Sequence, residues 1–80
     1  MNQPINSALL ILKVRKRLGL TQQEFAYRLG VALPTISRWE NKIHKPSPLA
    51  LDKVEALLVN MGDEGKAIRD KYFRKSTLIK

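Results

Sequence analysis

Side chains that can hydrogen-bond or neutralise phosphate are concentrated in one short stretch of the 80-residue sequence. Thr35, Ser37, Arg38 and Asn41 lie close together, and a basic run at residues 42–45 follows at once. A guanidinium group can bond O6 and N7 of guanine together. Cations on a loop can neutralise phosphates without distinguishing one base from another. These residue types in this order indicate binding chemistry directed at bases and phosphates.

No set of residues suited to catalysis or metal binding is evident. The chain has no cysteine, which excludes disulfides and thiolate metal sites. His44 is the only histidine, and one histidine without cysteine or a nearby carboxylate pair cannot build an ordinary metal site. The sequence contains no Ser-His-Asp set and no nucleotide-binding loop, and its carboxylates are few and scattered. We therefore expect no enzymatic activity, no metal and no cofactor.

Length and charge narrow the class of protein further. Fifteen Lys and Arg residues against seven Asp and Glu residues give a net charge of +8, which indicates an anionic partner, either nucleic acid or an acidic membrane surface. Eighty residues suit one domain, 1–80, with a core at about 7–74 and loose ends at 1–6 and 75–80. The apolar run at residues 8–12 is too short to span a bilayer. We expect the protein in the cytoplasm, associated with the nucleoid.

The polar stretch is preceded by a short helix with clear start and stop signals. Thr21 and Glu24 have the spacing of a capping box. Three apolar residues then recur at helical spacing: Phe25, Ala26 and Leu29. Gly30 follows directly and suits a left-handed C-terminal cap.

A second short helix is predicted after a turn at residues 31–33. Pro34 pre-sets a helical φ near its start, where no intrahelical donor is lost. Ile36 and Trp39 fall three residues apart on one side of this helix, so polar residues occupy the other sides. Trp39 could stack on nucleic acid, but its spacing from Ile36 favours a place in the core. Two helices joined by a glycine turn, with a polar and basic outer face, form a helix-turn-helix arrangement.

The sequence resembles the phage-repressor and Cro-like family, also called the XRE family, of prokaryotic DNA-binding domains. The resemblance covers about Ile11 to Leu58. It is carried by Arg15, by Leu18-Gly19-Leu20-Thr21-Gln22, by Ala26, by Leu29-Gly30-Val31, by Thr35-Ile36-Ser37-Arg38-Trp39-Glu40-Asn41, and by Pro46-Ser47-Pro48. The sequence departs from the family at Ala32, where Ser or Thr is frequent. It also departs at Leu33 and Pro34, where polar residues are frequent.

In helix-turn-helix proteins the N-terminal residues of the second helix meet base edges in the major groove. This places the expected base contacts at Leu33, Pro34, Thr35, Ser37 and Arg38. Arg38 could bond guanine or hold a phosphate instead. Leu33 and Pro34 could pack on a thymine methyl group or only shape the turn, and Thr35 could cap its own helix.

The phosphate contacts are expected on either side of that helix. Gln22 opens the first helix of the pair, where backbone N–H groups are unsatisfied, and the resemblance implies that this helix end abuts a phosphate. The resemblance also implies that the loop after the second helix runs beside the sugar-phosphate backbone. The full set of expected phosphate contacts is Gln22, Gln23, Asn41, Lys42, His44 and Lys45. The alternative for each of them is simple solvent exposure.

Arg15 and Glu40 are expected to form a structural ion pair. Each lies on a helix face that otherwise points inward, and a buried charge without a partner is costly. The resemblance implies the same pair between the first and third helices.

The remaining sequence predicts three more helices. The first runs from a cap at Asn6 or Ser7 to about Leu18, and its apolar residues nearly surround it. The fourth begins after Ser47 and ends at Gly62. The fifth starts at Asp63 and is predicted to turn Ala67, Ile68 and either Tyr72 or Phe73 inward. The fold class is therefore all-α, a five-helix phage-repressor-like domain.

The leading functional hypothesis is a sequence-specific binder of double-stranded DNA that regulates transcription, as a repressor at a palindromic operator. An alternative is an antitoxin-type protein that binds a toxin partner and its own operator, with the basic, partly apolar tail at residues 72–80 as the binding arm. A third hypothesis, a membrane-surface peptide, requires one amphipathic basic face, whereas these charges are spread over several helices.

A homodimer is expected on DNA, because one recognition helix meets too few base pairs to single out a site in a genome. The first candidate surface is apolar and lies in the C-terminal region: Ile68, Tyr72, Phe73, Leu78 and Ile79. Leu9 and Leu12 of the first helix form the second candidate surface. The alternative is that these residues only close the monomer core.

Overall fold

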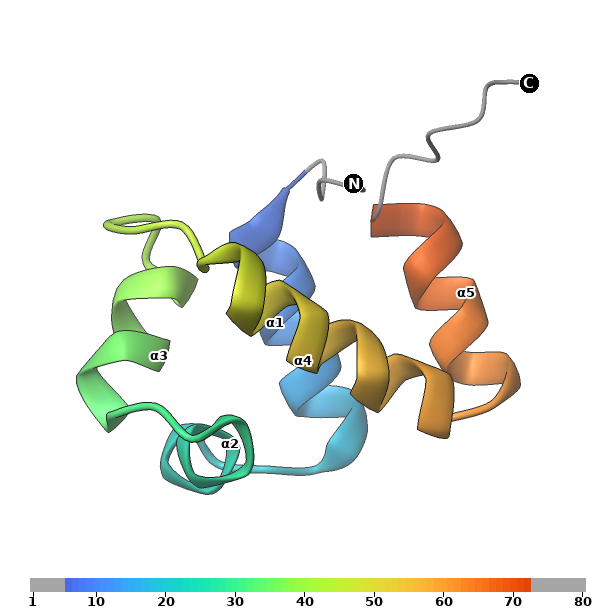
Figure 1. Ribbon diagram of the computed structural model, residues 1–80, viewed down its shortest axis with the longest axis horizontal. Coiled ribbons are helices and arrows are strands. Elements are labelled where there is room, and N and C mark those ends of the chain that lie inside the picture. The colour runs from blue at the N-terminus through green and yellow to red at the C-terminus, as the bar shows by residue number, and fades with distance from the viewer. Residues whose placement is uncertain (1–5, 73–80) are drawn as a thin grey trace.

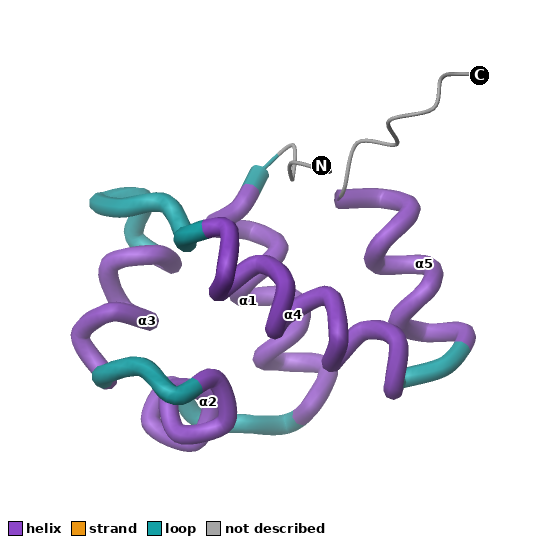
Figure 2. Tube along the Cα trace, viewed as in Figure 1, coloured by secondary structure: helices purple, strands orange, loops and turns teal. Residues whose placement is uncertain are grey.

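The structure, a computed structural model, describes residues 6–72, and this part of the chain is helical and contains no strand. Figure 1 shows its five helices in chain order: α1 (Ser7–Leu18), α2 (Gln22–Leu29), α3 (Leu33–Glu40), α4 (Pro48–Asn60) and α5 (Asp63–Tyr72). The predicted all-α, five-helix fold is confirmed. A short turn joins α2 to α3, and a longer loop joins α3 to α4, as Figure 2 shows.

The helix ends follow local capping signals. The Asn6 side-chain oxygen accepts a hydrogen bond from the Leu9 N–H at 3.1 Å, so Asn6 and not Ser7 caps α1. The capping box of α2 is complete: Thr21 Oγ1 accepts from the Glu24 N–H at 3.1 Å, and Glu24 Oε1 accepts from the Thr21 N–H at 2.8 Å. Gly30 ends α2 at a φ of 71°, a left-handed conformation that glycine adopts without steric cost.

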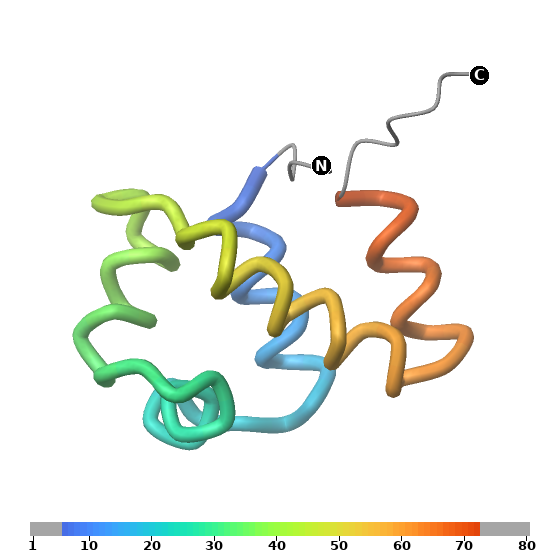
Figure 3. Tube along the Cα trace, in the orientation of Figure 1, coloured from blue at the N-terminus to red at the C-terminus, as the bar shows by residue number. Residues whose placement is uncertain are grey.

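One hydrophobic core receives residues from all five helices. In Figure 3, α1 passes behind α4, with α2 and α3 on one side and α5 on the other. The largest fully buried side chains are Phe25, Leu10, Ile11, Leu29, Ile36, Leu58, Val14 and Val54. Trp39 is buried in the same cluster, as its spacing from Ile36 predicts, and is not available to stack on a base.

The nearly all-round apolar character of α1 has its explanation in this arrangement. The helix packs against α3, α4 and α5 at once. Leu10 and Val14 are therefore fully buried within the monomer. Leu9 stays exposed and Leu12 is half-buried.

The inner face of α5 differs in part from the sequence prediction. Ile68 and Tyr72 are buried as expected, but Ala67 is exposed, so its predicted inward position is wrong. Phe73 lies outside the described residues. The buried position that the sequence analysis missed is Gly65, whose α-carbon faces the backbone of Leu58 in α4. A helix surface without a side chain lets the two backbones approach closely.

Candidate nucleic-acid interface

The rotation of α3 is fixed by the two side chains that it buries. Ile36 and Trp39 enter the core, so the residues on the opposite side of the helix face solvent. Pro34 and Arg38 are exposed there, and Leu33, in the first turn of the helix, keeps 41% of its surface accessible. The other two expected base contacts, Thr35 and Ser37, are half-buried on the flanks of the helix.

The N-terminus of α3 lacks a side-chain cap. Ala32 occupies the N-cap position, and no side chain accepts a hydrogen bond from the first turn. The Thr35 N–H instead donates to the Ala32 carbonyl at 2.9 Å. The alternative in which Thr35 caps its own helix is therefore wrong, because Thr35 already lies inside α3.

This end of α3 offers a direct test of stability. Ala32→Ser is expected to raise the free energy of unfolding by about 0.5–1 kcal/mol, because a serine hydroxyl can accept from the Thr35 N–H. Urea denaturation measures the change. The matched control is Ser47→Ala, which removes the 3.1 Å bond from the Ala50 N–H at the start of α4 and should cost about 1 kcal/mol. A loss in the control without a gain in Ala32→Ser would contradict the prediction.

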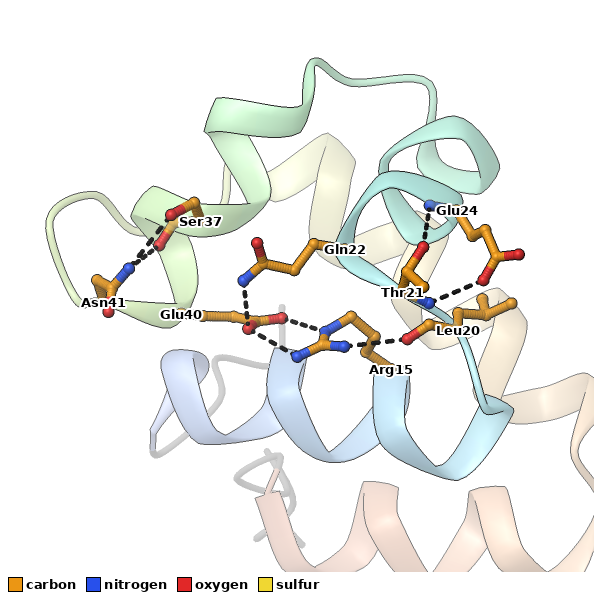
Figure 4. A network of polar contacts seen from close by, with 8 residues as sticks. All are labelled: Arg15, Leu20, Thr21, Gln22, Glu24, Ser37, Glu40 and Asn41. Atoms are coloured by element: carbon orange, nitrogen blue, oxygen red, sulfur yellow. Dashed lines mark hydrogen bonds and ion pairs between the residues drawn. The ribbon is translucent and has the colours of Figure 1, made fainter.

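Ser37 and Asn41 interact at the C-terminal end of α3. Figure 4 shows that Asn41 Nδ2 donates to the Ser37 carbonyl at 2.9 Å and to Ser37 Oγ at 3.2 Å. Asn41 is the C-cap residue of the helix, so its amide hydrogens already serve that cap. The Ser37 hydroxyl accepts from Asn41 and keeps its own hydrogen to donate. Of the two, Ser37 is thus the better placed to donate to DNA, and Asn41 would first have to leave its cap.

Arg15 and Glu40 form the expected ion pair, in two-pronged geometry. Arg15 Nε donates to Glu40 Oε2 at 2.7 Å, and Nη2 donates to Oε1 at 3.1 Å. A third donor of Arg15, Nη1, bonds the Leu20 carbonyl at 3.0 Å. The Arg15 and Glu40 side chains are only 16% and 8% exposed. The pair therefore ties α1 to the last residue of α3 and to the segment that leads into α2.

Gln22 joins this network, which the sequence analysis did not foresee. Its Nε2 donates to Glu40 Oε1 at 3.0 Å, and Figure 4 shows the two side chains pointing toward each other. The bond links the first residue of α2 to the last residue of α3. Gln22 is half-buried, and one of its two amide hydrogens remains for another acceptor. Gln23 is exposed beside it.

The loop after α3 carries the remaining expected phosphate contacts. Lys42, His44 and Lys45 are all exposed. Lys42 has a φ of 64°, which is uncommon for a residue with a side chain, and the turn is closed by a 2.9 Å bond from the Ile43 N–H to the Arg38 carbonyl.

An open hollow of about 360 Å³ lies between α3 and this loop. Its lining residues include Thr35 and Arg38 from the helix and His44 and Lys45 from the loop. The structure thus brings two expected base contacts beside two expected phosphate contacts. Among residues 6–72, Arg38 has no hydrogen bond or ion pair through its side chain, so its guanidinium is free to bind a ligand.

Other kinds of site find no support in the part of the chain that the structure covers. Residues 6–72 contain no group of three His, Cys, Asp or Glu side chains that could hold a metal ion. No helix in this range is long and apolar enough to cross a bilayer.

A comparison with family models decides the class of the protein. The model described as helix-turn-helix matches residues 11–58, which is more than half of the chain. The chain belongs to the helix-turn-helix family. This match runs from α1 to α4 and includes the α2–turn–α3 unit, so the resemblance to the XRE family is confirmed. No curated protein and no solved structure matches the chain.

Membership of the helix-turn-helix family indicates the general function of the protein. The family consists of DNA-binding transcription regulators and is typically not enzymatic. This protein is accordingly a DNA-binding regulator of transcription.

Proposed function

We propose that the protein recognises a specific site in double-stranded DNA by placing the N-terminal half of α3 in the major groove, and that it represses transcription by covering a promoter. The observation that carries this proposal is the exposure of Pro34 and Arg38 on the side of α3 opposite its buried residues, together with the exposure of Leu33 in the first turn. A helix held by one face in this way can enter a major groove with the other face.

Groups on both sides of α3 are suited to fix its position on the duplex. Gln22 stands at the start of α2 and is held against the end of α3 through Glu40. Lys42, His44 and Lys45 follow α3 on an exposed loop. Contacts from these positions to phosphates would set the register of the helix and leave base discrimination to α3. The protein would act in the cytoplasm, at the nucleoid.

Selection of bound sequences from random duplex DNA tests the proposal. We expect one enriched motif that contains guanine, the preferred partner of Arg38. Binding that depends on salt but enriches no motif would show a non-specific DNA binder. No binding to duplex DNA at any salt concentration would contradict the proposal as a whole.

The loop cations should determine how binding depends on salt. Lys42→Ala and Lys45→Ala are each expected to weaken binding to all duplex sequences alike. Each should also reduce the slope of log K against log salt by about 0.9, since one phosphate contact is lost. Lys66→Ala is the control, because Lys66 is exposed on α5, at the other end of the molecule from α3 in Figure 1. A changed sequence preference with an unchanged slope would assign these lysines a different role.

Arg38 should determine specificity. Arg38→Ala is expected to cost about 1–3 kcal/mol of binding free energy on the selected site and little on random DNA, because a bidentate contact to guanine is lost. Fluorescence anisotropy with both duplexes measures the difference. Equal losses on the two duplexes would identify Arg38 as a phosphate contact.

The protein would bind a palindromic operator as a homodimer, but the structure disfavours the dimer contact expected in the C-terminal region. Ile68 and Tyr72 are only 5% and 7% exposed, which favours the alternative that they close the monomer core. Phe73, Leu78 and Ile79 lie outside the described residues. Leu9 on α1 is exposed and is therefore the better placed candidate for the dimer contact.

A Leu9→Lys variant tests this dimer contact. If the variant binds a half-site normally but loses its preference for the full palindrome, the result supports a contact through Leu9, and an unchanged preference would exclude it.

A further inference from the structure

The side chains at the N-terminal end of α3 are apolar. Ala32 makes no side-chain cap, Leu33 is 41% exposed, and Pro34 is exposed and has no N–H. The next backbone donor, the Thr35 N–H, is already bonded to the Ala32 carbonyl at 2.9 Å. Residues 32–34, which we call the apolar turn, therefore have no side chain that can hydrogen-bond to a base edge.

We propose that the apolar turn selects thymine, through the C5-methyl group, at the base step that it faces. This inference rests on the proposed function and adds the chemistry of one part of the DNA site. The C5-methyl of thymine is the one large apolar group that base pairs present in the major groove. Against any other base edge, Leu33 and Pro34 would cover donors and acceptors without replacing their hydrogen bonds to water, which is unfavourable.

The position of Arg38 relative to the apolar turn predicts how far apart the guanine and the thymine lie in the DNA site. Pro34 and Arg38 are four residues apart in one helix and both are exposed, so they share a face. Their α-carbons are separated by about 6 Å along the helix axis, and successive base pairs of a duplex are about 3.4 Å apart. A guanine bonded by Arg38 should therefore lie within about two or three base pairs of the thymine.

Replacement of thymine by uracil tests the inference, because it removes only the methyl group and leaves every hydrogen-bonding group in place. Each dT of the selected site is replaced in turn by dU, and binding of the full chain is measured. Loss of contact with one methyl group should weaken binding about fourfold at one or two positions in each half-site. Replacement at the other positions should have no effect.

The protein variants assign the effect to residues. Leu33→Ala or Pro34→Ala should abolish the preference for dT over dU at the sensitive positions. The matched control is Leu49→Ala: Leu49 is also an exposed leucine in the first turn of a helix, 66% exposed on α4, and it is likewise next to a proline. This control should keep the full preference. Circular dichroism of all three variants checks that the fold is intact.

The outcomes separate this inference from the proposed function. If a motif is selected but no dT is sensitive to replacement, the thymine inference is wrong and the proposed function stands. If sensitivity persists in both Leu33→Ala and Pro34→Ala, another side chain contacts the methyl group and the apolar turn does not select thymine. If no motif is selected, the proposed function itself fails.

Discussion

Glu40→Ala is expected to lower the free energy of unfolding by about 3–5 kcal/mol. The substitution removes the carboxylate that accepts from Arg15 at 2.7 Å and 3.1 Å and from Gln22 at 3.0 Å. The guanidinium of Arg15 then remains in a site that is only 16% exposed, with the Leu20 carbonyl as its remaining partner. The cost is that of an uncompensated, poorly hydrated charge.

Two further variants test whether the loss comes from the buried ion pair: one removes its cation, and the other removes the cation of an exposed ion pair. Arg15→Ala should destabilise by a similar amount, since it leaves Glu40 without its cation. Arg17→Ala is the control: Arg17 and Glu64 are 3.7 Å apart, with side chains 50% and 62% exposed, and such surface pairs contribute at most about 1 kcal/mol.

A double replacement separates the loss of the pair from the loss of volume. Arg15→Met combined with Glu40→Leu removes both charges and keeps apolar bulk, so it should be more stable than either single alanine variant. Urea denaturation of the parent, of Arg15→Met and Glu40→Leu separately, and of the double variant gives the coupling between the two positions. If Glu40→Ala and Arg17→Ala lost the same small amount, the pair would have no special structural role.

Gly65→Ala is expected to cost about 2–3 kcal/mol of unfolding free energy, although alanine is the better helix former by about 1 kcal/mol. A β-carbon at position 65 would lie 2.6 Å from the carbonyl carbon of Leu58 and closer still to its oxygen. The atoms in the way belong to the backbone of α4, so a side-chain rotation cannot relieve the clash. Helices α4 and α5 would have to move apart and expose the core around Ile68.

An exposed neighbour provides the control for this substitution. Lys66→Ala introduces the same residue type one position later on the exposed side of α5, and should leave stability unchanged within about 0.5 kcal/mol. Thermal unfolding of both variants measures the contrast. A Gly65→Ala variant as stable as the parent would mean that α4 and α5 can separate at no cost. Because α5 lies outside the region matched by the family model, folded Gly65→Ala should retain the sequence preference of the parent.

The helix ends and the buried faces of the helices could be predicted from the sequence because they depend on residues close together in the chain. The capping box at Thr21 and Glu24 spans three residues, and the left-handed cap at Gly30 needs only the absence of a β-carbon. The spacing of Ile36 and Trp39 marked the buried side of α3, because a helix returns to the same face every three to four residues. These signals gave the five helices and the face of α3 that is turned toward solvent.

The Arg15–Glu40 ion pair was also predicted from the sequence. A buried charge without a partner is costly, which favours pairing of two opposite charges on inward faces, and the resemblance to the XRE family implied the same pair. The assignments of individual residues to bases or phosphates stay predictions until DNA binding is measured.

Only the tertiary structure decided the contacts between segments far apart in the sequence. Gln22 and Glu40 are 18 residues apart, and their bond depends on the angle between α2 and α3. The close approach of Gly65 to Leu58 depends on the distance between α4 and α5. The exposure of Ala67 beside the buried Ile68 depends on how α5 packs on α1 and α4. Periodicity identifies a face of a helix, but the partner of that face and its distance are set by the packing of the whole chain.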